Sequence, residues 1–147
     1  MIDFDKLSKI GKQPITLPLH AQPALEVLAA VRYLPNKRLV VKGRWAGQSV
    51  YAKIFFGQGH GKYAARDLRG VALLSQHFIQ TPELLCAAPS ECKQVYVLIF
   101  KALDAAVNAE DFSSVVPAKK LNLAIKIVKV IAQHHEAKIL QTDLYLK

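Results

Sequence analysis

Strand-like segments come before the first long helix of this sequence, and that order constrains the fold more than any other feature. Three β-rich runs, VRYL, RLVVKGRW and SVYAKIF, occupy residues 31–34, 38–45 and 49–55. Only the turn-forming segments PNK and AGQ separate them, so neighbouring runs are expected to pair as antiparallel hairpins. A doubly wound fold would instead alternate strands with helices. The sequence therefore predicts an α+β protein built on an antiparallel sheet.

The rest of the chain supplies two more predicted strands and two long helices. A helix is predicted over 62–78, after a glycine-rich loop, GQGHGK, at 57–62. Strands are predicted at 83–88 and 94–100, and the second of these is continuously apolar, which is typical of a central, buried strand. The second long helix covers 117–136. The sheet is therefore expected to have five strands, with one helix packed on it.

These elements divide the chain into three predicted parts. Residues 1–30 form an N-terminal extension that ends in a short helix, ALEVLAA at 24–30, with Pro23 in its first turn. Residues 31–103 hold the sheet and its helix. Residues 104–147 begin a helical part that is incomplete.

Composition and charge indicate a folded protein with anionic partners. Half of the 147 residues (52%) are hydrophobic, which excludes a disordered chain. Twenty basic residues against eleven acidic ones give a net charge of +9, so we expect attraction to phosphates, nucleotides, nucleic acid or acidic lipid headgroups. The charge does not choose among these anions.

The cysteines and the apolar segments indicate a cytoplasmic location. Cys86 and Cys92 have no second pair or histidine cluster beside them, so we expect buried or half-buried thiols in a reducing compartment and no zinc site. The N-terminus lacks the apolar core of a secretory signal. The apolar run at 95–100 is too short to span a bilayer. We expect a cytoplasmic protein that can contact an acidic inner membrane surface.

An acidic residue interrupts the apolar stripe of the helix predicted at 62–78. One face of this helix carries Ala64, Asp67, Val71, Leu74 and Phe78. If the stripe packs on the sheet, Asp67 needs a cationic partner, because an unpaired buried charge is costly. Lys53, on the preceding strand, is a natural candidate. In the alternative, Asp67 lies at the edge of the stripe and meets water or one of Arg66, Arg69 and Arg44.

Taken in their order along the chain, several motifs of this sequence resemble those of the protein kinase-like fold. That fold has the strand lysine of V-A-I-K, a glutamate in the following helix and the catalytic loop H-R-D-L-x-x-x-N. VYAK at 50–53 matches the first motif, and Asp67 stands where the glutamate would be. QTDLYLK at 141–147 matches the third, with Gln141 in place of the histidine and Asp143 as the aspartate.

More narrowly, the chain is similar to the lipopolysaccharide core kinases, bacterial enzymes that phosphorylate heptose or Kdo sugars. The similarity covers about residues 31–147 and is carried by LPNKRLV, VYAKIF, AARDLRGVALL and QTDLYLK. It implies a kinase-like N-lobe over 31–103, followed by the first long helix of a C-lobe. It also implies ATP-dependent phosphorylation of a sugar or glycolipid hydroxyl, with magnesium as the metal.

The resemblance assigns a role to each matching residue. Lys53 would hold the nucleotide phosphates, Asp67 would orient Lys53, and Asp143 would accept the proton of the acceptor hydroxyl. The turn PNKR contains no glycine, so Lys37 and Arg38 are expected to contact phosphate as side chains. The family's magnesium-binding asparagine would come after the last residue of the sequence. We therefore assign no metal ligand, and we expect the chain as given to lack kinase activity.

Two alternative functions remain open, and the sequence also predicts self-association. The chain could be a non-catalytic kinase-like module that binds nucleotide or a partner protein. It could instead be a small basic nucleic-acid-binding domain, which we disfavour because its aromatic residues are not interleaved with Lys and Arg on one predicted surface. The helix at 117–136 is apolar apart from one polar stripe, so self-association through it is expected.

Overall fold

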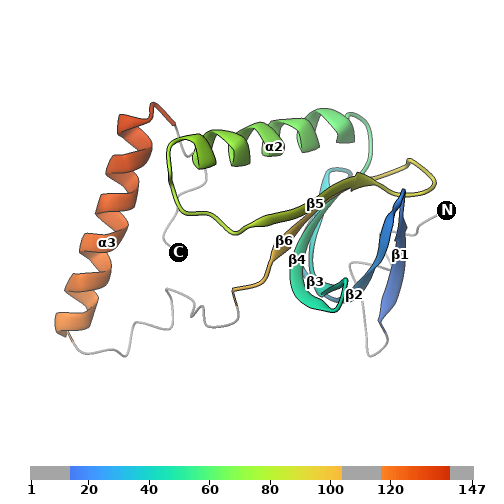
Figure 1. The fold of residues 1–147 in the computed structure, drawn as a ribbon, viewed down its shortest axis with the longest axis horizontal. Helices are drawn as coiled ribbons and strands as arrows, with labels where there is room; N and C mark the ends of the chain where they lie inside the picture. Colours follow the sequence, from blue (N-terminus) through green and yellow to red (C-terminus); the bar gives the residue numbers. More distant parts are fainter. Residues whose placement is uncertain (1–13, 104–116, 140–147) are drawn as a thin grey trace. The chain divides into compact units, whose positions relative to one another are not determined.

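The computed structural model describes residues 14–103 and 117–139. They divide into two compact units, Met1–Ala72 with Pro82–Leu103, and Leu73–Thr81 with Asp104–Lys147. The described residues form six strands and two helices (Figure 1). The strands are β1 (Ile15–Leu19), β2 (Gln22–Leu34), β3 (Arg38–Trp45), β4 (Gln48–Phe55), β5 (Leu84–Pro89) and β6 (Tyr96–Lys101); the helices are α2 (His60–Gln76) and α3 (Pro117–Glu136).

All strands belong to one antiparallel sheet, in the order β1-β2-β3-β4-β6-β5. This confirms the α+β class and the antiparallel sheet. It also confirms the central position of the strand predicted at 94–100, because β6 lies between β4 and β5. The predicted number of five strands is wrong, since the sheet has six.

The extra strand comes from the N-terminal segment, where the predicted short helix at 24–30 is also wrong. Residues 22–34 form one long strand, β2, paired with β1 on one side and β3 on the other. Leu25 and Val27 are fully buried at alternate positions. Alanine, leucine and glutamate favour a helix locally, but burial between two strands outweighs that preference.

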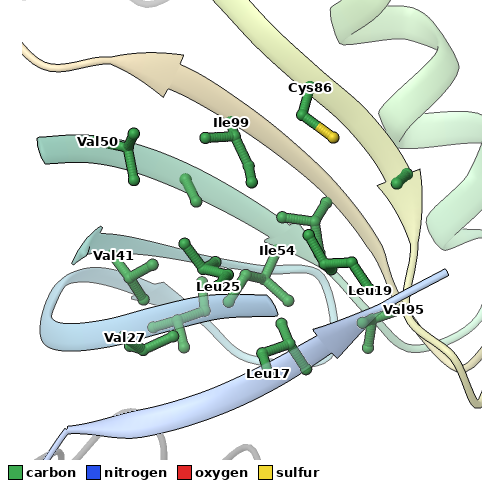
Figure 2. Close-up of a cluster of buried hydrophobic side chains, with 14 of the residues drawn as sticks. Leu17, Leu19, Leu25, Val27, Val41, Val50, Ile54, Cys86, Val95 and Ile99 are labelled. Carbon is green, nitrogen blue, oxygen red and sulfur yellow. The ribbon is translucent and has the colours of Figure 1, made fainter. Parts of the chain in front are cut away.

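The inner face of the curled sheet holds the main hydrophobic core. Figure 2 shows side chains from several strands converging on this core. The core is closed at one end where β1 meets the β5–β6 turn: the backbone N–H of His20 donates to the carbonyl of Pro89 over 3.0 Å, and Glu91 donates to Pro18. The two edge strands therefore protect each other there.

Tight turns set the register of the strands that carry the site. The β3–β4 hairpin has a two-residue loop, Ala46 and Gly47, both with positive φ (48° and 78°). Such a loop matches the twist of the two strands. It confirms the hairpin predicted at AGQ, and it fixes which residues of β3 and β4 face the same side.

The loop predicted over 57–62 is wrong in its second half, because α2 begins at His60. Gly57 has a φ of 75°, and a Cβ on it would collide with the carbonyl oxygen of Asn36 in the β2–β3 turn. Glycine here lets the chain pass that turn and enter the helix. At its other end α2 stops at Gln76, so Phe78, predicted to extend the apolar stripe, has a positive φ and is 92% exposed.

Helix α2 covers the outer face of the sheet. Ala64 is buried against Phe55, Leu98 and Phe100 in a second, smaller cluster. Two apolar layers therefore lie on opposite sides of β4 and β6: the inner core and the layer beneath α2. This packing brings Asp67 of α2 to the outer face of β4.

Helix α3 has the predicted bounds of 117–136. Its large exposed apolar side chains are Leu121, Ile125, Ile127, Val128 and Val130. Self-association through this helix stays a prediction. Among the described residues, neither helix is long and apolar enough to cross a membrane.

The assignment of β2 can be tested by a pair of substitutions on that strand. Leu25→Ala is expected to lower the free energy of unfolding by about 2–5 kcal/mol, because the leucine is fully buried. Val31→Ala, on the same strand but 57% exposed, should change it by less than about 0.5 kcal/mol. Urea denaturation measures both, and equal effects would contradict the buried strand.

Candidate functional site

The candidate site lies on the outer face of the sheet, beside α2. Val50, Ala52 and Ile54 of β4 are fully buried in the inner core. The side chains between them, which include Tyr51 and Lys53, therefore point to the outer face. Cross-strand register places Lys53 between Val40 of β3 and Leu98 of β6.

Lys53 and Asp67 form an ion pair, and this confirms the pairing expected from the sequence. The Nζ atom of Lys53 donates a hydrogen bond to Oδ2 of Asp67 over 2.9 Å. The Asp67 side chain is 16% exposed and that of Lys53 is 35% exposed. The alternative in which Asp67 meets only water or a neighbouring arginine from the set Arg66, Arg69 and Arg44 is wrong.

Arg38, at the start of β3, is the second cation beside Asp67. Its Nη1 atom lies 3.6 Å from Oδ2 of Asp67, and its guanidinium carbon lies 6.0 Å from the ring centre of Phe55. The Nε atom of Arg38 is buried and has no hydrogen-bond partner. Two cations thus share one carboxylate, and one buried N–H donor is unsatisfied, which is costly without an acceptor.

The aromatic ring of Phe100 forms part of the floor beneath this cluster. Nζ of Lys53 lies 5.4 Å from its centre. An ammonium group over a ring is held by the ring's negative face, and neighbouring apolar side chains strengthen electrostatic interactions by excluding water. The Lys53–Asp67–Arg38 cluster is therefore a partly exposed site of net positive charge on an apolar base.

Lys37, another predicted site residue, lies outside this cluster. Lys37 lies in the β2–β3 turn with an exposed side chain. Its backbone N–H donates to Leu34, and its carbonyl accepts from Phe56. Within the described ranges, no ion pair joins Lys37 to Asp67. Asp143 lies outside the described residues, so its role stays a prediction.

The position of Lys42 beside Tyr51 on the outer face does not follow from the sequence alone. Lys42 of β3 lies directly across from Tyr51 of β4, and both are exposed. Lys42 and Tyr51 therefore form one basic–aromatic pair on a shared surface. The alternation of apolar and basic residues in RLVVKGRW was the available signal, but the strand register was needed to place Tyr51 beside it.

Neither cysteine is placed to form a zinc site with other described residues. Cys86 is buried, and the prediction of a buried or half-buried Cys92 is wrong, because that thiol is exposed. In the part of the chain that the structure describes, no group of three or more His, Cys, Asp or Glu side chains could hold a metal ion.

The chain matches no family model, and comparison with curated proteins and with solved structures finds no significant similarity. A function for this chain must therefore be inferred from its own motifs, its fold and the geometry of the site.

A double-mutant cycle tests the ion pair. Lys53→Met and Asp67→Asn are each expected to lower the free energy of unfolding. The loss in the double variant should be smaller than the sum of the two single losses by about 1 kcal/mol. Urea denaturation gives the free energies. Lys101→Met is the matched control, because this exposed strand lysine lies across from Val50, away from the cluster. The effects of Lys101→Met and Asp67→Asn on the free energy of unfolding should add. Additive effects of Lys53→Met and Asp67→Asn would contradict the ion pair.

The two thiols should differ in reactivity. A hydrogen bond with the Ser90 hydroxyl, 3.3 Å from Sγ, and then one with the backbone of Gln94 lower the pKa of Cys92, whereas burial raises the pKa of Cys86. A lowered pKa increases the thiolate fraction at neutral pH, so iodoacetamide should modify Cys92 first.

The pH profile of Cys92 alkylation, followed by mass spectrometry, tests the cause of this difference. Ser90→Ala should move its midpoint to higher pH, because the hydroxyl gives the largest stabilisation of the thiolate. Ser49→Ala, an exposed serine on β4, is the control and should leave the profile unchanged. An unshifted profile in Ser90→Ala would rule out this hydrogen bond as the cause.

Proposed function

We propose that the Lys53–Asp67–Arg38 cluster binds the phosphates of ATP, and that the chain has a protein kinase-like fold of the lipopolysaccharide core kinase type. The observation that carries the proposal is the ion pair between a lysine on β4 and a carboxylate on the next helix, α2. In protein kinases a strand lysine contacts the nucleotide phosphates and pairs with an acidic residue of the following helix.

The order of elements supports the same proposal. Strands β2, β3 and β4 precede α2, strands β5 and β6 follow it, and the long helix α3 comes later. This is the order of the N-lobe and first C-lobe helix expected from the resemblance. Strand β1 is an addition before that series, paired with β2.

The charges of the cluster suit a phosphate ligand. Lys53 has two N–H donors beyond the one used by Asp67, and the guanidinium of Arg38, whose side chain is 21% exposed, carries further N–H donors. A phosphate oxygen can accept from both side chains and balance the excess positive charge. Asp67 then holds Lys53 in place, which limits the rotamers that the lysine would otherwise sample.

The activity that this site would serve is transfer of the γ-phosphoryl group of ATP to a sugar or glycolipid hydroxyl. Asp143 is the proposed acceptor of the hydroxyl proton. Magnesium would neutralise phosphate charge in such a reaction. The described residues offer no metal-binding group, and the carboxylate of Asp67 already contacts two cations, so no step is assigned to the metal.

Titration of the full chain with ATP, followed by calorimetry, tests the nucleotide site. Lys53→Met should weaken binding at least about tenfold, since it removes a charge-assisted contact. Lys101→Met is the matched control, with the same chemical change on an exposed residue of β6, and should change affinity less than about twofold. No ATP binding by the unmodified chain at millimolar concentration would rule the proposal out.

Asp67→Asn separates an orienting role from simple electrostatics. If Asp67 positions Lys53, this variant binds ATP more weakly. If the cations act only through their charge, removal of a carboxylate strengthens binding. A second titration with magnesium distinguishes the alternatives: tighter binding favours a phosphotransferase, whereas metal-independent binding favours a non-catalytic nucleotide-binding module.

A further inference from the structure

Beyond the cluster, the outer face of β3 carries basic side chains that the ATP proposal does not use. Lys42 and Arg44 alternate along β3 with the buried residues Val41 and Gly43. Both therefore point to the outer face, and both are exposed.

The neighbouring strands extend this surface on both sides. On β2, the exposed Arg32 lies across from Val40, in the same row as Lys53. On β4, Tyr51 lies directly across from Lys42 and is 40% exposed. We call Arg32, Lys42, Arg44 and Tyr51 the outer basic face.

Within the described residues the charge of this face is not neutralised by ion pairs. Asp67 pairs with Lys53 and Arg38, and in the part of the chain that the structure describes Arg32, Lys42 and Arg44 form no ion pair. The acidic residue nearest in register is Glu26, across from Arg44. The face therefore combines several cations with few acids, on a chain whose net charge is +9, and it is complementary to a polyanion.

Tyr51 distinguishes one kind of polyanion from the others. Its ring is flanked by Lys42 on β3 and by Phe100 on β6. An exposed aromatic ring among cations can stack on a nucleobase while the cations contact the phosphates. Duplex nucleic acid keeps its bases stacked inside, and a lipid headgroup offers no base.

We propose that the outer basic face binds single-stranded nucleic acid, with Tyr51 stacking on a base and Arg32, Lys42 and Arg44 contacting phosphates. The curled antiparallel sheet provides a rigid support of the kind that oligonucleotide-binding barrels use. This function goes beyond the proposed ATP site, because none of these four residues belongs to the Lys53–Asp67–Arg38 cluster.

Fluorescence anisotropy with a labelled twelve-residue oligothymidylate tests the proposal on the full chain. A plot of log affinity against log NaCl concentration should have a slope of about −2, for three phosphate contacts at about 0.7 each. Lys42→Gln should make this slope less negative by about 0.7, and Arg44→Gln should have the same effect. Lys101→Gln, on the inner-face side of β6, is the matched control and should leave it unchanged.

Variants of Tyr51 test base stacking separately from charge. Tyr51→Ala should weaken binding by between about fivefold and a hundredfold without changing the salt slope, and Tyr51→Phe should retain most of the affinity. Circular dichroism and urea denaturation check that each variant folds. If Tyr51→Ala binds like the unmodified chain, or duplex DNA, heparin and anionic vesicles bind as tightly as the oligonucleotide, the proposal is wrong.

Measuring the affinity of each variant for both ATP and the oligonucleotide distinguishes the outer basic face from the ATP site. Lys42→Gln and Arg44→Gln should leave ATP affinity unchanged, whereas Lys53→Met should lose ATP binding and keep most of its oligonucleotide affinity. Failure to bind the oligonucleotide with ATP binding intact would overturn the nucleic-acid proposal alone. Loss of both ligands in Lys42→Gln would show a single shared site and would overturn the proposal of a separate face.

Discussion

The alternation of side chains along β4 determines which face of the sheet carries Lys53 and its ion pair with Asp67. Every second residue, Val50, Ala52 and Ile54, is fully buried inside the curled sheet. Their neighbours must therefore face outward, which is how a lysine comes to lie on the side that α2 covers. A shift of one residue in register would move Lys53 into the core and break its contact with Asp67.

Charge balance on the outer face then separates two regions. Near α2, Asp67 brings Lys53 and Arg38 together around one carboxylate. Farther along β3, the exposed Lys42 lies across from Tyr51, and the exposed Arg44 lies across from Ser49 and Glu26 without forming an ion pair in the described residues. The two proposals follow this difference: a compact group of phosphates for the first region, and an extended anion with flat rings for the second.

The errors of the sequence analysis have a common physical origin. Residues 24–30 have helix-forming composition, yet they form a strand because β1 and β3 pair with both of their edges. Cys92 was expected to be at least half-buried, but a tight turn after β5 exposes it. Tyr51 was not linked to Lys42, because cross-strand neighbours follow from register rather than from distance along the chain.

The sequence by itself determined the antiparallel α+β class, the hairpin at Ala46 and Gly47, the bounds of α3 and the candidate pairing of Lys53 with Asp67. These features depend on local turn chemistry and on side-chain periodicity, which neighbouring residues encode. Only the tertiary structure decided the sixth strand, the proximity of Arg38 to Asp67 and the outer basic face. Each of these depends on which distant segments pair, and that choice is made by the burial of apolar surface over the whole sheet.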